Sequence, residues 1–273
     1  MDKPVVMITG ASSGIGKSTA LTLGRNGFRV VLAARRIEKL EEIADRIRKD
    51  GGEAYPVFLD LSDVENIKRV VSLVKADIGE IEILVNNAGS ARHLWLDELD
   101  LEKDIHHQIQ INLIGMIQLT RAVLVDMLAA GSGQIIHVAS ITSWVGVPTY
   151  SIYSASKFGA RGFYESLRRE LRGKGITISE VFPGAVDTEF AHDPEIAWRT
   201  TTVAPEFALL SSQDVAEKIL QMIKTKQKRS VIPEIMRLVI WGNTLFPRLV
   251  GWVFSWFFYT KKDKRYSWGQ TRE

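Results

Sequence analysis

Cysteine is absent from the 273-residue sequence, which excludes disulfides, thiolate metal sites and cysteine nucleophiles. The formal charge is only +3, and so small an excess does not point to nucleic acid as a partner. No set of His, Asp and Glu residues has the spacing of metal ligands, so we expect no metal. The N-terminus lacks the basic and apolar regions of a signal peptide, and we expect a cytoplasmic protein.

What is present is an alternation of short apolar runs with helical patterns. The strand-like runs lie at residues 4–9, 28–34, 53–60, 82–89, 135–139, 175–182 and 230–233. This order predicts an α/β fold, a single doubly wound parallel sheet with helices on both faces. No repeat or linker divides the chain. We therefore expect one domain over residues 1–233, with residues 234–273 as its hydrophobic and basic C-terminal extension.

A glycine-rich turn follows the first strand and opens the first helix. Gly10 permits the tight turn, Gly14 lets backbone approach a pyrophosphate, and Gly16 allows close packing of helix on strand. The helix N-terminus then faces the negative charge. Strand, glycine turn and helix in this order indicate a dinucleotide-binding loop; a glycine-rich turn without a ligand is the alternative.

The second strand ends in Arg35 and Arg36, with no acidic residue between Val30 and Ile37. A carboxylate at this position holds the ribose 2′-hydroxyl of NAD, whereas an arginine accommodates the 2′-phosphate of NADP. The arginines could also be solvated charges at a helix start. The missing acid and the two arginines together favour NADP(H) over NAD(H).

Polar residues also close the third and fourth strands. Asp60 either caps its strand end or reaches the adenine side of a cofactor, and residues 62–65 predict a capping box for helix 63–77. Asn87, Ala88 and Gly89 can brace the neighbouring strand and lie along the cofactor; a plain turn is the alternative.

Asn112 interrupts the apolar helical pattern of about residues 102–130. An amide there lowers helix propensity and must be satisfied if it is buried. It is either a satisfied core amide or the site of a kink that aligns a water or a lysine.

The stretch from Ser140 to Lys157 carries the chemistry. Tyr153 and Lys157 are four residues apart, so on a helix they share one face. A neighbouring ammonium favours the phenolate, and we expect it to lower the pKa of Tyr153 from its ordinary value of about 10. Ser140, at a strand end, can hydrogen-bond an oxygen that gains negative charge. These groups suit carbonyl and alcohol chemistry, with a redox cofactor to carry the hydride.

Pro183 and Gly184 end the strand at 175–182, and Thr188 is placed to cap a helix or bond a cofactor amide. Residues 189–210 are irregular and of mixed polarity, which predicts a mobile substrate lid.

The ordered set of motifs resembles the short-chain dehydrogenase/reductase family, in its compact branch of about 250 residues with a Rossmann-like fold. The motifs are TGASSGIG at 9–16, NNAG at 86–89, Asn112, Ser140, YSASK at 153–157 and PG at 183–184, so the resemblance covers about residues 4–233.

The resemblance implies a catalytic tetrad of Asn112, Ser140, Tyr153 and Lys157. It also implies that Lys157 holds the nicotinamide ribose, that Thr188 contacts the carboxamide, and that a hydride passes at the nicotinamide C4. Tyr153 would exchange the proton, relayed through the ribose, Lys157 and a water near Asn112, while Ser140 holds the substrate oxygen. The cofactor-binding residues are then Gly10, Ser12, Ser13, Gly14, Ile15, Gly16, Arg35, Arg36, Asp60, Leu61, Asn87, Ala88, Gly89, Tyr153, Lys157, Pro183, Gly184, Val186 and Thr188.

Tyr150 introduces an alternative, because it precedes Lys157 by seven residues, the spacing of the family's enoyl reductases. The intact glycine loop favours carbonyl chemistry instead. We expect Tyr150 to line the substrate site together with Ser140 and Tyr153.

From residue 235 the sequence is rich in tryptophan and other apolar residues, and Lys261, Lys262, Lys264 and Arg265 follow. Pro247 and Arg248 interrupt the run, which predicts two short helices rather than a bilayer span of about 20 residues. Attachment of residues 235–265 to a membrane surface is one interpretation, and a subunit interface or a lid over the active site are the others.

The leading hypothesis is therefore an NADPH-dependent carbonyl reductase for a hydrophobic, lipid-like substrate such as a steroid, retinoid, long-chain acyl or sphingoid compound. Enoyl reduction and a non-catalytic, membrane-associated dinucleotide-binding protein are the alternatives. The resemblance also implies a homodimer or tetramer.

Overall fold

A seven-stranded parallel sheet forms the centre of the protein, which confirms the predicted doubly wound α/β fold. The computed structural model describes residues 3–188 and 209–260, with side chains as far as residue 253. The strand order is β3-β2-β1-β4-β5-β6-β9. The strands are β1 Val5–Thr9, β2 Arg29–Ala34, β3 Glu53–Phe58, β4 Ile83–Asn86, β5 Gly133–Val138, β6 Ile176–Pro183 and β9 Arg229–Ile232.

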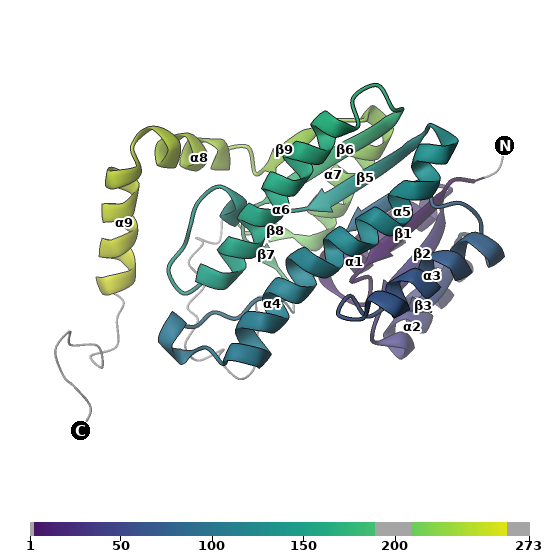
Figure 1. Ribbon diagram of the computed structural model, residues 1–273, viewed down its shortest axis with the longest axis horizontal. Helices are drawn as coiled ribbons and strands as arrows, with labels where there is room; N and C mark the ends of the chain where they lie inside the picture. The colour runs from purple at the N-terminus through teal and green to yellow at the C-terminus, as the bar shows by residue number, and fades with distance from the viewer. Residues whose placement is uncertain (1–2, 189–208, 261–273) are drawn as a thin grey trace.

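Helices cover both faces of this sheet (Figure 1). One face packs against α3 (Val64–Asp77), α5 (Met116–Ala130) and α6 (Ser151–Glu170). The other packs against α1 (Gly14–Arg25), α2 (Ile37–Lys49) and α7 (Ser212–Thr225). Because both faces are covered, β1 is buried at every position and reads as a continuous apolar run.

The direction of strand addition reverses at β1. The chain adds β2 and β3 on one side of β1, and β4 then pairs with its other edge. In open α/β sheets this reversal creates a crevice beyond the carboxyl ends of the strands, where ligands bind. The residues that follow β1, β4 and β5 therefore meet at one edge of the sheet.

The helical run at residues 101–130 is not a regular α-helix. Two π-helical stretches, η2 (Leu101–His106) and η3 (Gln110–Gly115), flank the short α4 (His107–Ile109) before α5 begins. Such π-turns often lie at functional sites, and η3 contains Asn112. Among the described residues this run is the one helix long and apolar enough to cross a bilayer, but α5 packs its apolar face into the core.

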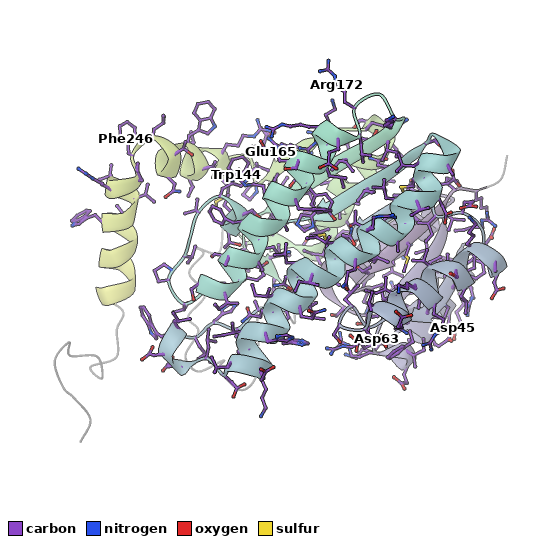
Figure 2. All side chains as sticks on the ribbon, in the orientation of Figure 1. Asp45, Asp63, Trp144, Glu165, Arg172 and Phe246 are labelled. Carbon is purple, nitrogen blue, oxygen red and sulfur yellow. The ribbon has the colours of Figure 1, made fainter. Side chains whose placement is uncertain are left out.

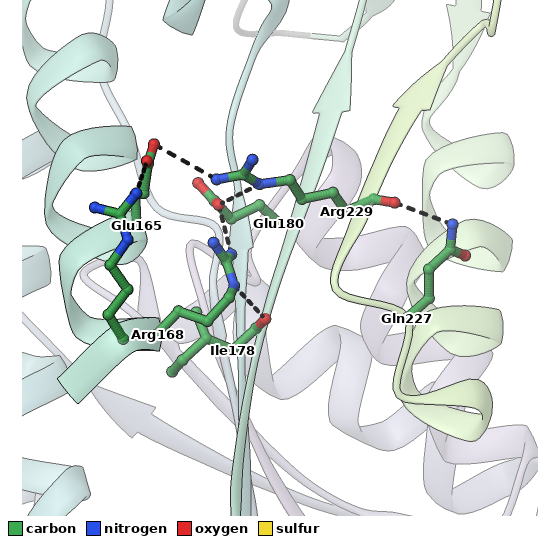
Figure 3. A network of polar contacts seen from close by, with 7 residues as sticks. Glu165, Arg168, Ile178, Glu180, Gln227 and Arg229 are labelled. Atoms are coloured by element: carbon green, nitrogen blue, oxygen red, sulfur yellow. Dashed lines mark hydrogen bonds and ion pairs between the residues drawn. The ribbon is translucent and has the colours of Figure 1, made fainter. Parts of the chain in front are cut away.

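A buried ionic network attaches α6 to the edge of the sheet (Figure 3). Glu180 of β6 accepts a hydrogen bond of 2.6 Å from Arg168 of α6 and pairs with Arg229 of β9 at 3.5 Å. Burial raises the pKa of Glu180, and the two arginines oppose that shift. Removing one partner of a buried pair costs about 3–5 kcal/mol because the remaining charge is left uncompensated, so Glu180 holds Arg168 of α6 and Arg229 of β9 in a fixed arrangement.

Two further helices, α8 (Met236–Leu245) and α9 (Pro247–Thr260), project beyond β9 (Figure 1, yellow). Pro247 opens α9, which confirms the predicted division into two short helices. Met236, Ile240 and Asn243 of α8 face the domain built on the central sheet. Phe246, at the bend between the helices, stands clear of that domain (Figure 2).

Candidate active site

The loop between β1 and α1 has the shape that a dinucleotide requires. Gly10 and Gly14 have φ values of +64° and +51°, a region that favours glycine. A Cβ on Gly16 would overlap the carbonyl oxygen of Gly10, so this position also needs glycine. Thr188 lies beside the loop, since a Cβ on Gly14 would be 3.1 Å from Thr188 Cγ2. The fold thus brings two distant parts of the predicted cofactor site together.

Asn87 and Ala88 join the end of β4 to the end of β1. Asn87 Nδ2 donates to the carbonyl oxygen of Thr9 at 2.9 Å, and the backbone N–H groups of Asn87 and Ala88 each donate to Thr9 Oγ1 at 3.0 Å. The predicted bracing of the neighbouring strand is confirmed. Thr9 escapes sequence reasoning because a threonine at a strand end is an ordinary β-branched residue there.

Arg36 lies over the glycine loop. Its guanidinium donates to Ser12 Oγ from Nη2 at 2.9 Å and from Nε at 3.1 Å, and to Ser13 Oγ from Nη2 at 2.9 Å. A planar cation beside two hydroxyls suits a phosphate group. With the open glycine cradle, these residues fit a dinucleotide that carries a 2′-phosphate, which is NADP(H).

The charge of Arg35 acts on Asp60. Burial would raise the pKa of Asp60, but hydrogen bonds from Ser62 and the charge of Arg35 lower it. The Asp60 carboxylate accepts from Ser62 N at 2.9 Å and from Ser62 Oγ at 2.6 Å, which supports the strand-end interpretation. The predicted capping box is wrong, because Asp63 rather than Ser62 caps α3. Leu61 is buried in the core.

Ser140, Tyr153 and Lys157 meet at the carboxyl end of β5. Helix α6 begins at Ser151, so Tyr153 and Lys157 occupy neighbouring turns of its buried face and are 7% and 3% exposed. Ser140 hydrogen-bonds Tyr153. Lys157 Nζ donates to the Val138 carbonyl oxygen at 3.2 Å and lies 5.6 Å from the centre of the Tyr153 ring. The predicted shared face of the helix is confirmed.

Burial determines the proton affinities of this pair. It raises the pKa of Tyr153 to about 12, which the hydrogen bond from Ser140 offsets only in part. It lowers the pKa of Lys157 from 10.5 to about 8. The pKa of Tyr153 is therefore raised overall rather than lowered as expected, because burial disfavours the charged phenolate.

Asn112 connects the loop after β4 to α6. Its Oδ1 accepts from Ser90 N at 2.7 Å, and its Nδ2 donates to Ser90 O at 2.7 Å and to Ser156 Oγ at 3.1 Å. Asn112 is thus a buried amide with its hydrogen bonds satisfied, which agrees with the interpretation of a satisfied core amide. It also lies in π-helical turns beside the site, since a Cβ on Gly89 would be 3.3 Å from Asn112 Oδ1 and 4.0 Å from Lys157 Nζ.

The remaining predicted residues lie around the same crevice edge. Tyr150 is the N-cap of α6, with its ring centre 5.8 Å from that of Tyr153. Pro183 ends β6, and Gly184 N donates to Ile232 O at 2.8 Å. Val186 lies in the short strand β7 (Val186–Asp187), which pairs with β8 (Leu210–Ser211). The predicted lid at 189–210 falls almost wholly outside the described residues.

The cluster of Arg36, Ser12 and Ser13 predicts which nucleotide the protein prefers. Arg36→Ala should weaken NADPH binding about 10- to 100-fold and leave NADH binding nearly unchanged, because only NADPH carries the 2′-phosphate. Fluorescence titration of each nucleotide measures both affinities. Arg46→Ala, an exposed arginine of the same helix, is the matched control. Equal losses for the two nucleotides would contradict the assignment.

Comparison with known proteins places these features in a family. The family model described as short chain dehydrogenase matches residues 4–196. A dehydrogenase/reductase SDR family protein 7-like of Drosophila melanogaster is 32% identical over 259 residues, 92% of this chain and 79% of that protein. An NADP-dependent 3-hydroxy acid dehydrogenase of Schizosaccharomyces pombe is 35% identical over 244 residues, which cover 86% of this chain and 92% of that protein.

A solved structure agrees with the sequence relatives. A variant of actinorhodin polyketide ketoreductase, crystallised with NADPH, is 32% identical with a TM-score of 0.77, and the match covers 84% of this chain and 95% of that one. Sequence relatives and a solved structure thus agree on the same class of oxidoreductase. The chain belongs to the short-chain dehydrogenase/reductase family.

Proposed function

We propose that this oxidoreductase uses NADP(H) to interconvert a ketone or aldehyde and the corresponding alcohol. The observation that carries the proposal is the meeting of half-buried Ser140 with buried Tyr153 and Lys157, at the sheet edge that also holds the glycine loop. The Arg36, Ser12 and Ser13 cluster supports NADP(H) as the cofactor. The NADPH-bound ketoreductase neighbour supports carbonyl chemistry.

The described side chains divide the proton chemistry between them. When bound, NADP(H) supplies or accepts the hydride. The hydroxyls of Ser140 and Tyr153 are positioned by their mutual hydrogen bond to hold one substrate oxygen. With its pKa raised to about 12, the Tyr153 phenol retains its proton at neutral pH and can donate it to that oxygen as charge develops. Lys157, with a pKa of about 8, titrates closer to neutrality and can return a proton to Tyr153.

Substituting Tyr153 tests this division. Tyr153→Phe should reduce NADPH-dependent ketone turnover by roughly 10²–10⁴-fold, the usual contribution of a general acid, with NADPH affinity maintained. Steady-state assays of NADPH oxidation with a ketone panel, and nucleotide titration, provide the two readouts. Tyr150→Phe removes the neighbouring hydroxyl and is the matched control.

The outcome also separates the alternatives. Ketone turnover that survives in Tyr153→Phe contradicts the proposal. Reduction of an activated enone that survives in Tyr153→Phe and is lost in Tyr150→Phe assigns enoyl chemistry to Tyr150. Nucleotide binding without turnover of any ketone by the wild-type protein supports a non-catalytic role.

We further propose that α8 and α9 rest on a membrane surface and that the substrate is correspondingly lipid-like. Leu238, Trp241 and Trp252 are 68%, 65% and 67% exposed, and Leu245, Phe246 and Leu249 are similarly exposed. Fully burying one such side chain contributes about 1.5–3 kcal/mol. Helices of 10 and 14 residues are each too short to span a bilayer, which needs about 20 residues. Arg237 and Arg248 supply positive charge beside this apolar face, as in interfacial helices.

A vesicle sedimentation assay tests the membrane proposal. The double variant Trp241→Glu/Leu245→Glu should reduce binding to vesicles of phosphatidylcholine and phosphatidylserine by roughly tenfold or more, because two apolar anchors become charged. Leu73→Glu/Leu101→Glu places the same charges on exposed leucines elsewhere and should bind like the wild type. Unchanged binding of the α8 variant contradicts the proposal. A stable dimer that this variant dissociates would assign the face to a second copy of the chain.

The basic residues at 261–265 lie outside the described residues. The expected homodimer or tetramer stays a prediction.

A further inference from the structure

Three aromatic rings form a row that ends at the catalytic tyrosine. The His93 ring lies 3.9 Å from the Tyr150 ring between centres, tilted by 50°. The Tyr150 ring lies 5.8 Å from the Tyr153 ring, tilted by 59°. His93 comes from the loop that follows β4, and the two tyrosines come from the start of α6. Residues far apart in the sequence thus form one aromatic surface beside the phenol that exchanges the proton.

The loop that carries His93 is anchored at the residues just before it. Before it, the side-chain amide of Asn112 bonds both the N–H and the carbonyl oxygen of Ser90 at 2.7 Å. At the adjacent residue, Arg92 N donates to Gln108 Oε1 at 3.2 Å and Arg92 Nε to Asp104 Oδ1 at 3.0 Å. Asp104 and Gln108 are buried, which fixes the loop against the π-helical turns. The fold therefore holds the backbone that leads into His93.

Tyr150 is held by a turn of unusual backbone conformation. Thr149 has a φ of +68°, which is sterically costly for a β-branched residue. The Tyr150 N–H closes the turn on the Val147 carbonyl oxygen at 3.1 Å. Residues held in such conformations concentrate at ligand-binding and active sites, where the surroundings maintain them. Here the turn directs the Tyr150 ring between His93 and Tyr153.

We propose that His93 is a specificity-determining residue. Together with Tyr150 it forms the wall against which a flat, unsaturated group bonded to the carbonyl carbon packs, so the site prefers aryl ketones to saturated ketones of equal size. Offset or edge-to-face contacts between π systems stabilise a complex beyond the area that they bury. Tyr150 and His93 are both half-buried beside Tyr153. His93 does not exchange the proton, and this proposal rests on the carbonyl chemistry proposed above.

A matched pair of substrates measures the preference. Acetophenone and cyclohexyl methyl ketone differ mainly in the flatness and unsaturation of the ring. The ratio of their kcat/KM values should fall about 3- to 10-fold in His93→Ala, the size of one aromatic contact, and the change should lie mainly in the KM for acetophenone. His93→Phe restores a ring at the same position and should recover the ratio. His106→Ala, an exposed histidine of η2, should leave it unchanged.

The outcomes distinguish the proposed role of His93 from the carbonyl chemistry on which it depends. An unchanged ratio in His93→Ala, or an equal loss for both ketones that His93→Phe does not recover, overturns the role of His93. If the wild-type protein reduces neither of these ketones nor any other member of the ketone panel, the carbonyl proposal fails. In that case calorimetric binding of the two ketones to the NADP⁺-loaded protein still tests the wall, because His93→Ala should remove any preference for acetophenone. Equal binding of both ketones by the wild type overturns the proposed role of His93.

Discussion

The removal of Lys157 from water is the constraint on which the rest of the site depends. A buried ammonium is disfavoured, and the hydrogen bond to the Val138 carbonyl, the one that Lys157 Nζ donates among the described residues, offsets only part of that cost. The first turns of α6 must therefore be held in place by other interactions. Ala160, Tyr164 and Leu167 pack the same helix into the core, and the Glu180 network attaches it to β6 and β9. Stability gained along the helix thus maintains a destabilised functional group at its start.

The same burial explains why the pKa of Tyr153 is raised, whereas the sequence predicts that it is lowered. Spacing correctly predicts that the two residues share a helix face, because that follows from helix geometry alone. The direction of the Tyr153 pKa shift depends on how much water the surrounding strands and loops exclude. Distant elements supply that exclusion, so local spacing does not reveal it. The consequence is that the Tyr153 phenol carries its proton at neutral pH, whereas the Lys157 amine has a pKa of about 8, closer to neutral pH.

Much of the fold and part of the site follow from local pattern. The seven strands were predictable because each is a short apolar run between helical patterns, and the glycine loop because three positions exclude a side chain. Asn112 stands out as an amide in an apolar helix, but its bonds to Ser90 and Ser156 are tertiary. His93 lies in an irregular loop, where no periodicity marks it.

The central claim is that Lys157 is buried as a strained cation, and unfolding as a function of pH tests it most directly. Its pKa of about 8 in the folded protein lies below its unfolded value of about 10.4, so the folded state binds fewer protons between these values. Stability conferred by this residue should be lowest below pH 8 and should rise as the pH approaches 10.4. The free energy of unfolding of the wild type, relative to Lys157→Met, should therefore increase by about 3 kcal/mol between pH 7 and 10.4. A difference that does not change with pH would mean that Lys157 keeps its ordinary pKa, and would contradict the account.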